Sequence, residues 1–220
     1  MKVGAVIVGA GFGRRMGQAK ANISLAGRPL FSYSLETFLT VGSIKQVVLV
    51  LQKKHFKFAD KFISGQGVVL AEGGKTRKQS VLNGLNKIKS NLSYVLIHDC
   101  ARPFVKKQTV LKVIKELKNY PAVIPGIKTK DTLRQIEGGL VKKTLERDNI
   151  FSIQTPQGFR KDLIKAAYKK YQRLRITDSA QLFEKTGHPV KVVEGDLFNF
   201  KLTYREDIDL AKAVEKYGKI

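Results

Sequence analysis

The sequence predicts an α/β fold in which a mostly parallel β-sheet is covered by helices. Short apolar runs rich in valine and isoleucine alternate with amphipathic stretches along most of the chain, a rhythm typical of strand–helix–strand units. The first apolar run, residues 3–8, has no helical period and leads directly into a glycine-rich loop, which indicates a buried parallel strand. Residues 132–145 depart from this rhythm and predict a β-hairpin inserted in the fold.

The helices and strands follow one another in the order expected for such a sheet. Pro29 suits the first turn of a helix whose apolar residues, Leu35 and Phe38 among them, recur at helical spacing. Thr203–Glu206 has the capping-box pattern and predicts that the last helix opens there. The remaining strands are expected at 47–51, 68–70, 94–97, 122–124 and 190–193, and the remaining helices at 56–62, from about Arg77, at 109–117, and near Lys161 and Asp178.

The hairpin centres on Gly138 and Gly139, which separate two β-like runs. Paired glycines favour the tight turns that join antiparallel strands. An isolated two-stranded ribbon is marginally stable in water, so an arm at about residues 128–149 needs another surface to cover it. We therefore expect a β-arm that packs on a second copy of the chain, in a homodimer.

The composition indicates a single domain, residues 1–220, of a soluble cytoplasmic protein. Cys100 is the single cysteine, so an internal disulfide is excluded, as suits a reducing compartment. The first residues lack a signal-peptide pattern, and no apolar stretch approaches the roughly 20 residues needed to span a bilayer. We expect no membrane partner.

The net charge of +23 comes from 41 basic and 18 acidic residues. A nucleic-acid-binding protein would gather its basic residues on one face, whereas lysine and arginine are spread here along the whole chain without a long run. A lysine-rich surface that also attracts phosphate-bearing ligands explains the charge better. We therefore expect no nucleic-acid partner, and keep a basic nucleic-acid-binding α/β protein as the alternative of a different class.

The glycine-rich loop after the first strand indicates a phosphate site. Gly9, Gly11 and Gly13 allow backbone N–H groups to approach an anion, and Arg14 and Arg15 follow to grip phosphate oxygens. The spacing is G-x-G-x-G, not G-x-G-x-x-G, and no acidic residue ends a second strand about 20 residues later. The loop therefore argues against a nicotinamide cofactor.

The hexapeptide His98–Pro103 follows another apolar strand and carries a lone carboxylate, Asp99. Open α/β sheets bind ligands at the carboxyl ends of their strands. A carboxylate that faces bound phosphates there is a candidate magnesium ligand. We interpret His98 as a packed histidine at the strand end, and Cys100 as a small buried residue.

A second glycine pair, Gly73 and Gly74, follows the third strand and lies shortly before Ser80. Backbone amides and carbonyls at paired glycines are able to contact the edge of a flat base, and a serine hydroxyl adds a polar group. Taken alone, the pair indicates only a turn. Thr177 and Asp178 are equally weak alone, since these residue types also cap helices.

Together these motifs form an ordered set that resembles one enzyme family, 2-C-methyl-D-erythritol 4-phosphate cytidylyltransferase. The resemblance extends over essentially the whole chain. The set comprises Ala10–Met16, Lys20 with Leu25–Gly27, Glu72–Gly74 with Arg77 and Ser80, His98–Pro103, Asp131–Thr132, Arg147, Thr155–Gln157, Thr177–Asp178, and Glu194–Gly195 with Asn199, Lys201 and Thr203.

The resemblance implies a Rossmann-like sheet, a β-arm exchanged across a homodimer, and a reaction in which CTP and methylerythritol phosphate are joined with release of pyrophosphate. It also implies Mg²⁺ as the cofactor. By position, it assigns catalysis to Arg15, Lys20 and Lys201, nucleotide binding to Gly9, Ala10, Gly11, Gly13, Gly74, Lys75 and Ser80, substrate binding to Asp99, Arg102, Thr132, Arg147 and Thr177, and metal binding to Asp99, with Thr132 and Arg147 supplied by the partner's arm.

A ribitol-5-phosphate cytidylyltransferase is the nearest alternative, because it shares most of the nucleotide motifs. The segments Lys130–Leu133 and Ile176–Asp178 favour methylerythritol phosphate. The sequence departs from the family pattern where Ala19–Ala21 stands for the common Pro-Lys-Gln, and the loop that carries Lys20 is shorter than usual.

Overall fold

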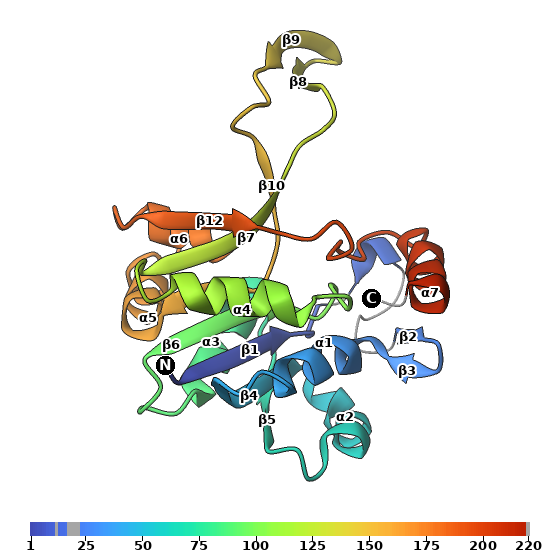
Figure 1. The fold of residues 1–220 in the computed structure, drawn as a ribbon, viewed down its shortest axis with the longest axis vertical. Coiled ribbons are helices and arrows are strands. Elements are labelled where there is room, and N and C mark those ends of the chain that lie inside the picture. Colours follow the sequence, from blue (N-terminus) through green and yellow to red (C-terminus); the bar gives the residue numbers. More distant parts are fainter. Residues whose placement is uncertain (12, 17–22, 219–220) are drawn as a thin grey trace.

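The computed structural model describes residues 1–11, 13–16 and 23–218 and contains an eight-stranded sheet between two layers of helices (Figure 1). The strand order is β10-β7-β11-β6-β1-β4-β5, and β12 pairs with β7 beside this path. The α/β prediction is confirmed. Within the described residues, no helix is long and apolar enough to cross a membrane.

Four parallel strands form the half of the sheet that the apolar runs predicted. β1 (Val3–Val8) pairs in parallel with β4 (Ile44–Leu51) and with β6 (Tyr94–Asp99), and β4 pairs with β5 (Val68–Glu72). β1 and the later residues of β4 are almost wholly buried because helices cover both faces. The register sets Val8 opposite Asp99, so the carboxyl ends of β1 and β6 meet at one edge.

The other half of the sheet contains two antiparallel strands that the sequence did not predict, β10 (Phe151–Ile153) and β11 (Gln157–Arg160). β11 lies between β6 and β7 (Ala122–Lys128) and runs opposite to both. β7 extends beyond the strand expected at 122–124, and its Pro125 carbonyl accepts a hydrogen bond from Gln154 N–H. β12 (Val190–Glu194) is parallel to β7.

Helices pack on both faces of the sheet close to where their apolar spacing placed them. α1 (Leu30–Leu39), α2 (Phe56–Ile63) and α4 (Lys107–Glu116) contribute to one buried cluster. The second cluster, on the other face, receives side chains from α3 (Arg77–Lys87), α5 (Lys161–Lys170) and α6 (Ala180–Glu184).

A third, smaller cluster supports the edge of the sheet where the glycine-rich loop lies. It joins the short hairpin of β2 (Ser24–Leu25) and β3 (Arg28–Pro29) to α7 (Asp207–Tyr217). The predicted capping box at Thr203 is wrong. α7 begins at Asp207, whose carboxylate accepts hydrogen bonds from the backbone N–H groups of Thr203 and Tyr204 at 2.6 and 2.8 Å, and so replaces the expected cap.

The β-arm projects away from the body of the molecule beyond β10 (Figure 1). In the described part of the chain, β8 (Leu133–Glu137) and β9 (Leu140–Leu145) pair only with each other, in a separate two-stranded sheet. Gly138 and Gly139 have φ angles of +58° and +82°, which glycine adopts without strain. The predicted hairpin is confirmed, and its apolar side chains Ile136, Leu140 and Val141 are exposed.

Candidate active site

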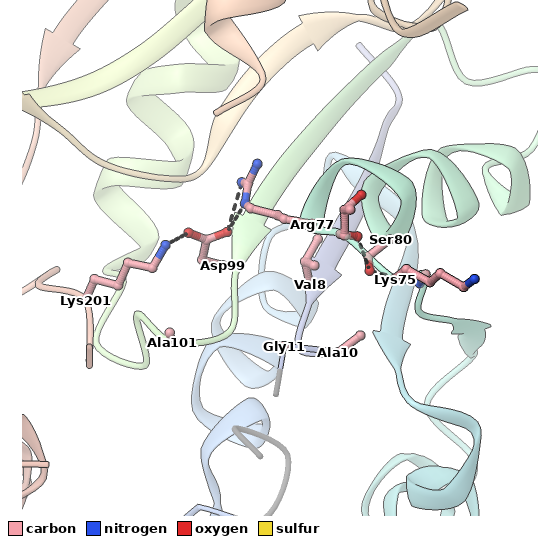
Figure 2. A pocket seen from close by; sticks show the side chains of 11 residues that line it. Val8, Ala10, Gly11, Lys75, Arg77, Ser80, Asp99, Ala101 and Lys201 are labelled. Carbon is pink, nitrogen blue, oxygen red and sulfur yellow. Dashed lines mark hydrogen bonds and ion pairs between the residues drawn. The ribbon is translucent and has the colours of Figure 1, made fainter. Parts of the chain in front are cut away.

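A pocket opens at the edge of the sheet where β1 and β6 end (Figure 2). Its volume is about 150 Å³. The loop after β1 forms one wall, the turn before α3 forms another, and Asp99 lies between them and Lys201. The lining residues are Val8, Ala10, Gly11, Gly74, Lys75, Thr76, Arg77, Ser80, Asp99, Ala101 and Lys201. Seven of them were expected from the sequence as site residues: Ala10, Gly11, Gly74, Lys75, Ser80, Asp99 and Lys201.

Two cations hold the Asp99 carboxylate. Lys201 Nζ donates to Asp99 Oδ2 at 2.6 Å, and Arg77 Nε–H donates to Oδ1 at 3.0 Å. Arg77 Nη2 lies 2.9 Å from the same oxygen, as an ion pair without an aligned hydrogen bond. Burial alone would raise the pKa of the Asp99 carboxyl, but the charges of Arg77 and Lys201 outweigh burial and hold that pKa well below its usual range.

Arg77 lines the pocket, although the sequence assigned it no role of its own. It occupies the first position of α3, directly after the N-cap Thr76. Burial opposes the charge of this guanidinium, and the negative charge of Asp99 overcomes that effect, so the pKa of Arg77 is raised. An arginine at the start of a helix that follows paired glycines was the available signal, but its partner is 22 residues away in the sequence.

The turn before α3 is held rigidly by its own hydrogen bonds. Gly74 N–H donates to Ser80 Oγ at 3.0 Å, and Ser80 Oγ donates to the Thr76 carbonyl at 2.9 Å. The Ser80 hydroxyl hydrogen is therefore used within the turn, and the Ser80 oxygen is left to act only as an acceptor for a ligand. The Lys75 side chain points away from Asp99 in Figure 2. Gly73 is required because a Cβ there would lie 2.1 Å from that of Ala10.

The glycine-rich loop begins with a tightly packed residue, Gly9, and continues with Gly11, which has open space around it. A Cβ at Gly9 would lie 2.8 Å from Leu51 Cδ2 and 3.0 Å from Cys100 Sγ, so Gly9 packs beneath the pocket and does not line it. Gly11 has open space around it, and Gly13 has a φ of +57°. The exposed Arg15 stacks its guanidinium over Tyr204, 5.4 Å from the ring centre. The predicted catalytic Lys20 lies outside the described residues.

Arg102 lies beside the pocket and points at main-chain oxygens. Its Nη1 donates to the Asn199 carbonyl at 2.7 Å, and Nη2 donates to the Ile153 carbonyl at 3.2 Å. Its buried Nε–H has no protein partner in the described part of the chain. The guanidinium thus fixes the segment that leads to Lys201.

Three predicted substrate residues, Thr132, Arg147 and Thr177, do not line this pocket. Thr132 and Arg147 are exposed on the arm, where Arg147 Nη1 donates to the Lys130 carbonyl at 2.5 Å. Thr177 is exposed before α6, and its backbone N–H donates to Gln181 Oε1 at 2.9 Å. A single chain therefore assembles only part of the predicted site.

The donor set for a metal ion is small. Among the described residues, no group of three or more histidine, cysteine, aspartate or glutamate side chains is placed to hold one. Asp99 is the carboxylate in the lining of the pocket. Mg²⁺ commonly binds through one or two carboxylates together with substrate phosphates. The residues present therefore fit an ion that arrives on a nucleotide.

Comparisons with known proteins agree with this architecture. The family model described as 2-C-methyl-D-erythritol 4-phosphate cytidylyltransferase matches residues 3–216. Proteins of that name from Clostridium novyi and Geobacillus thermodenitrificans are 39% and 36% identical to this chain; the alignments cover 96% and 97% of this chain and 95% and 97% of theirs.

Solved structures extend the agreement to three dimensions. The 4-diphosphocytidyl-2C-methyl-D-erythritol synthase of Anaerococcus prevotii superposes with a TM-score of 0.89 at 35% identity, over 98% of this chain and 96% of that one. The 2-C-methyl-D-erythritol 4-phosphate cytidylyltransferase of Thermus thermophilus gives a TM-score of 0.83 at 33% identity, over 98% and 100% of the two chains.

Proposed function

Because this chain belongs to the 2-C-methyl-D-erythritol 4-phosphate cytidylyltransferase family, we propose that it transfers the cytidylyl group of CTP to 2-C-methyl-D-erythritol 4-phosphate and releases pyrophosphate. The observation that carries the proposal is the cluster of Asp99, Arg77 and Lys201 at the mouth of two glycine turns. The cluster offers cations to phosphates, and the turns offer polar backbone groups to a base.

The reaction is a displacement at phosphorus. A phosphate oxygen of the polyol substrate attacks the α-phosphorus of CTP, a new P–O bond forms, and the bond to the bridging oxygen of pyrophosphate breaks. Such transfers depend on positioning and on neutralising charge. Lys201 would neutralise the α-phosphate region, while Arg15 and Lys20 would grip the triphosphate and stabilise the crowded phosphorus.

The nucleotide base would bind against the two glycine turns. Ala10 and Gly11 form one side of the pocket, and Gly74 and Ser80 the other. The acceptor that Ser80 leaves free suits an exocyclic amino group such as that of cytosine. Lys75 would contribute its backbone, since its side chain points away.

Asp99 would hold Mg²⁺ brought by the nucleotide. When bound, the ion would supply charge neutralisation on the phosphates and make the α-phosphorus more electrophilic. For Asp99 to take this role, Lys201 must exchange the carboxylate for a phosphate oxygen. Its ammonium is the more accessible of the two cations, with 35% of its side chain exposed against 26% for Arg77.

The active form would be a homodimer in which each arm completes the other chain's site. Exposed Ile136, Leu140 and Val141 give the arm an apolar surface that a partner would cover. An apolar groove at its base, lined in part by Phe151 and Leu197, would continue that surface. Thr132 and Arg147 would then reach the polyol phosphate in the partner's pocket.

The proposed setting is the cytoplasm, where CTP and a phosphorylated polyol are available. Ribitol 5-phosphate is the rival substrate, and it would use the same nucleotide site. The residues on the arm and at Thr177 would distinguish the two polyols, because they lie apart from the base and triphosphate contacts.

Release of pyrophosphate tests the proposal directly. The purified full chain, supplied with CTP and Mg²⁺, should release pyrophosphate with 2-C-methyl-D-erythritol 4-phosphate. Ribitol 5-phosphate should be a much poorer substrate. Preferential turnover of ribitol 5-phosphate would overturn the substrate assignment, and no release with either polyol would overturn the proposed function.

A further inference from the structure

His98 lies fully buried next to Asp99 in the sequence, and both of its ring nitrogens have partners. Nδ1 is 2.9 Å from Thr155 Oγ1, and Nε2 is 3.1 Å from the Arg102 carbonyl oxygen. Its ring also packs on Phe38, with 5.1 Å between ring centres. No nitrogen is left free for proton transfer to a substrate.

The partners fix the proton on His98 Nε2 and favour Nδ1 as an acceptor. A carbonyl oxygen only accepts, so the hydrogen must be on His98 Nε2. The backbone N–H of Asp99 donates to Thr155 Oγ1 at 3.1 Å. His98 Nδ1 lies at hydrogen-bond distance to accept the Thr155 hydroxyl hydrogen, an arrangement that favours a neutral imidazole in the Nε2–H form. This series of hydrogen bonds runs from the Asp99 N–H through Thr155 to His98, and from His98 to the Arg102 carbonyl.

The same group connects three separate segments of the site. Asn199 Nδ2 donates to the Thr155 carbonyl at 2.8 Å, and the Asn199 carbonyl accepts from Arg102. Two residues later, Lys201 reaches the Asp99 carboxylate. The hydrogen bonds and the ion pair therefore form a closed ring that includes the main chain next to Asp99 and Lys201.

We propose that His98 is a positioning residue of the transfer reaction, locked as the Nε2–H tautomer, and that through Thr155 it holds the Asp99–Arg102 turn at the pocket. The role in catalysis rests on the proposed function, whereas the tautomer rests on the geometry of the network alone. Small displacements of charged groups matter here, because a misplacement of about 1 Å costs on the order of 10²-fold in rate.

Nitrogen NMR of the wild-type chain tests the tautomer without any substrate. The side-chain ¹⁵N signals at neutral pH should show a protonated Nε2 and an unprotonated Nδ1 for His98, whose signals are identified by their absence from His98→Phe or, failing that, by their coupling to neighbouring protons. His55 and His188 serve as internal references. A protonated Nδ1, in either a neutral or a charged ring, would overturn the proposal.

Kinetics of a matched pair test the positioning role. Thr155→Val keeps the shape but removes the hydroxyl, so kcat/KM should fall at least about tenfold, mainly through kcat. Thr155→Ser restores the hydroxyl and should recover most of the activity. The double variant Thr155→Val with His98→Phe should lose little more activity than the worse single variant, because both substitutions break the same series of hydrogen bonds.

The outcomes separate this proposal from the proposed function. If Thr155→Val keeps wild-type kinetics while folded, His98 does not act through Thr155 and the proposal is wrong. If the wild type turns over neither polyol phosphate, the proposed function fails, and the NMR result still decides the tautomer. The NMR result also stands if the variants fail to fold.

Discussion

The ion pairs around Asp99 and the Glu137–Lys142 ion pair near the turn of the arm have the same chemistry but different surroundings. The side chain of Asp99 is 10% exposed, and it is held by two cations that come from distant parts of the chain. On the arm, Glu137 and Lys142 are 70% and 54% exposed. Solvent weakens an exposed pair and leaves a buried one strong. The difference indicates that the body of the molecule carries a preassembled half of the site.

The residues proposed for the other half of the site, on the arm, do not reach this pocket in the described part of one chain. Thr132 and Arg147 are exposed there and lie outside the pocket that Asp99 lines. Among the described residues, no third strand lies beside the arm's two strands, and the arm's Ile136, Leu140 and Val141 are exposed.

Removal of the Asp99 charge should have the largest effect. Asp99→Asn leaves Arg77 and Lys201 facing each other across a neutral amide, and loss of one partner of a buried pair costs about 3–5 kcal/mol of unfolding free energy. Urea denaturation measures this loss. The variant should also need more Mg²⁺ for activity. An unchanged unfolding free energy would show that the two cations find other partners.

Acid should lower the unfolding free energy because His98 in the body of the molecule is buried in its neutral form. Burial lowers the pKa of His98 to about 4. The charge of Asp99 and the hydrogen bond to the Arg102 carbonyl raise that pKa and only partly compensate, while the guanidinium charge of Arg102 lowers it slightly. The unfolded chain, with a histidine pKa near 6.5, binds the proton more tightly. The contribution of neutral His98 to stability is therefore complete above pH 6.5 and is lost as the pH falls towards 4.

The expected loss over this window is on the order of 3 kcal/mol. The unfolding free energies of the wild type and of His98→Phe, measured from pH 7 to pH 4.5, should converge as the pH falls. His55, whose pKa burial also lowers, is present in both proteins, so the comparison removes its contribution. Parallel curves would contradict the prediction.

Mixing two inactive variants, one changed in the body and one in the arm, should restore part of the activity. Lys201→Ala damages the body and Arg147→Ala damages the arm, and each alone should lower kcat on the order of 10²-fold. In a mixed dimer one site carries both changes and the other carries neither. Random reassortment makes half of the dimers mixed, so activity should return to roughly a quarter of wild type.

The control for this experiment is a mixture of Lys201→Ala with the double variant, which contains no intact site and should not recover. Exchange of subunits is checked by mass spectrometry of differently tagged chains. If exchange occurs and activity does not return, Arg147 serves its own chain or neither, and the exchanged arm is excluded.

The exposed pair on the arm should have the smallest effect. Glu137→Gln removes the carboxylate that Lys142 contacts, and an exposed pair of this kind contributes less than about 1 kcal/mol. The unfolding free energy and kcat should both stay close to wild type. A loss as large as that of Asp99→Asn would contradict the prediction and would mean that this ion pair, and not only the arm's apolar side chains, is buried in the functional assembly.

Local patterns were sufficient to predict most of the fold. The apolar runs at 3–8 and 94–97 predicted the central parallel strands, and Gly138–Gly139 predicted the turn of the arm. β11 was missed because it has four residues and contains a glycine, which lacks the pattern of a buried strand. A Cβ at that glycine, Gly158, would lie 2.7 Å from Leu117, so packing and not propensity selects it.

The site was predicted as a set of residues but not as a set of contacts. Asp99 and Lys201 were both expected, yet their ion pair joins positions 102 residues apart. Arg77 escaped assignment because its role depends on that same carboxylate. The start of α7 was misplaced because the Asp207 carboxylate accepts the Thr203 N–H that the capping box assigns to Glu206, and pattern alone does not rank these two carboxylates.

The projecting arm has a consequence for how the enzyme responds to dilution. In the proposed homodimer a working site contains groups from two chains, so in dilute solution the number of sites rises with the square of the free chain concentration. Activity per milligram should therefore fall as the sample is diluted past the dissociation constant. A flexible linker between two chains would replace that dependence with a fixed effective concentration, in the millimolar range for short linkers, and activity would become proportional to protein at every dilution.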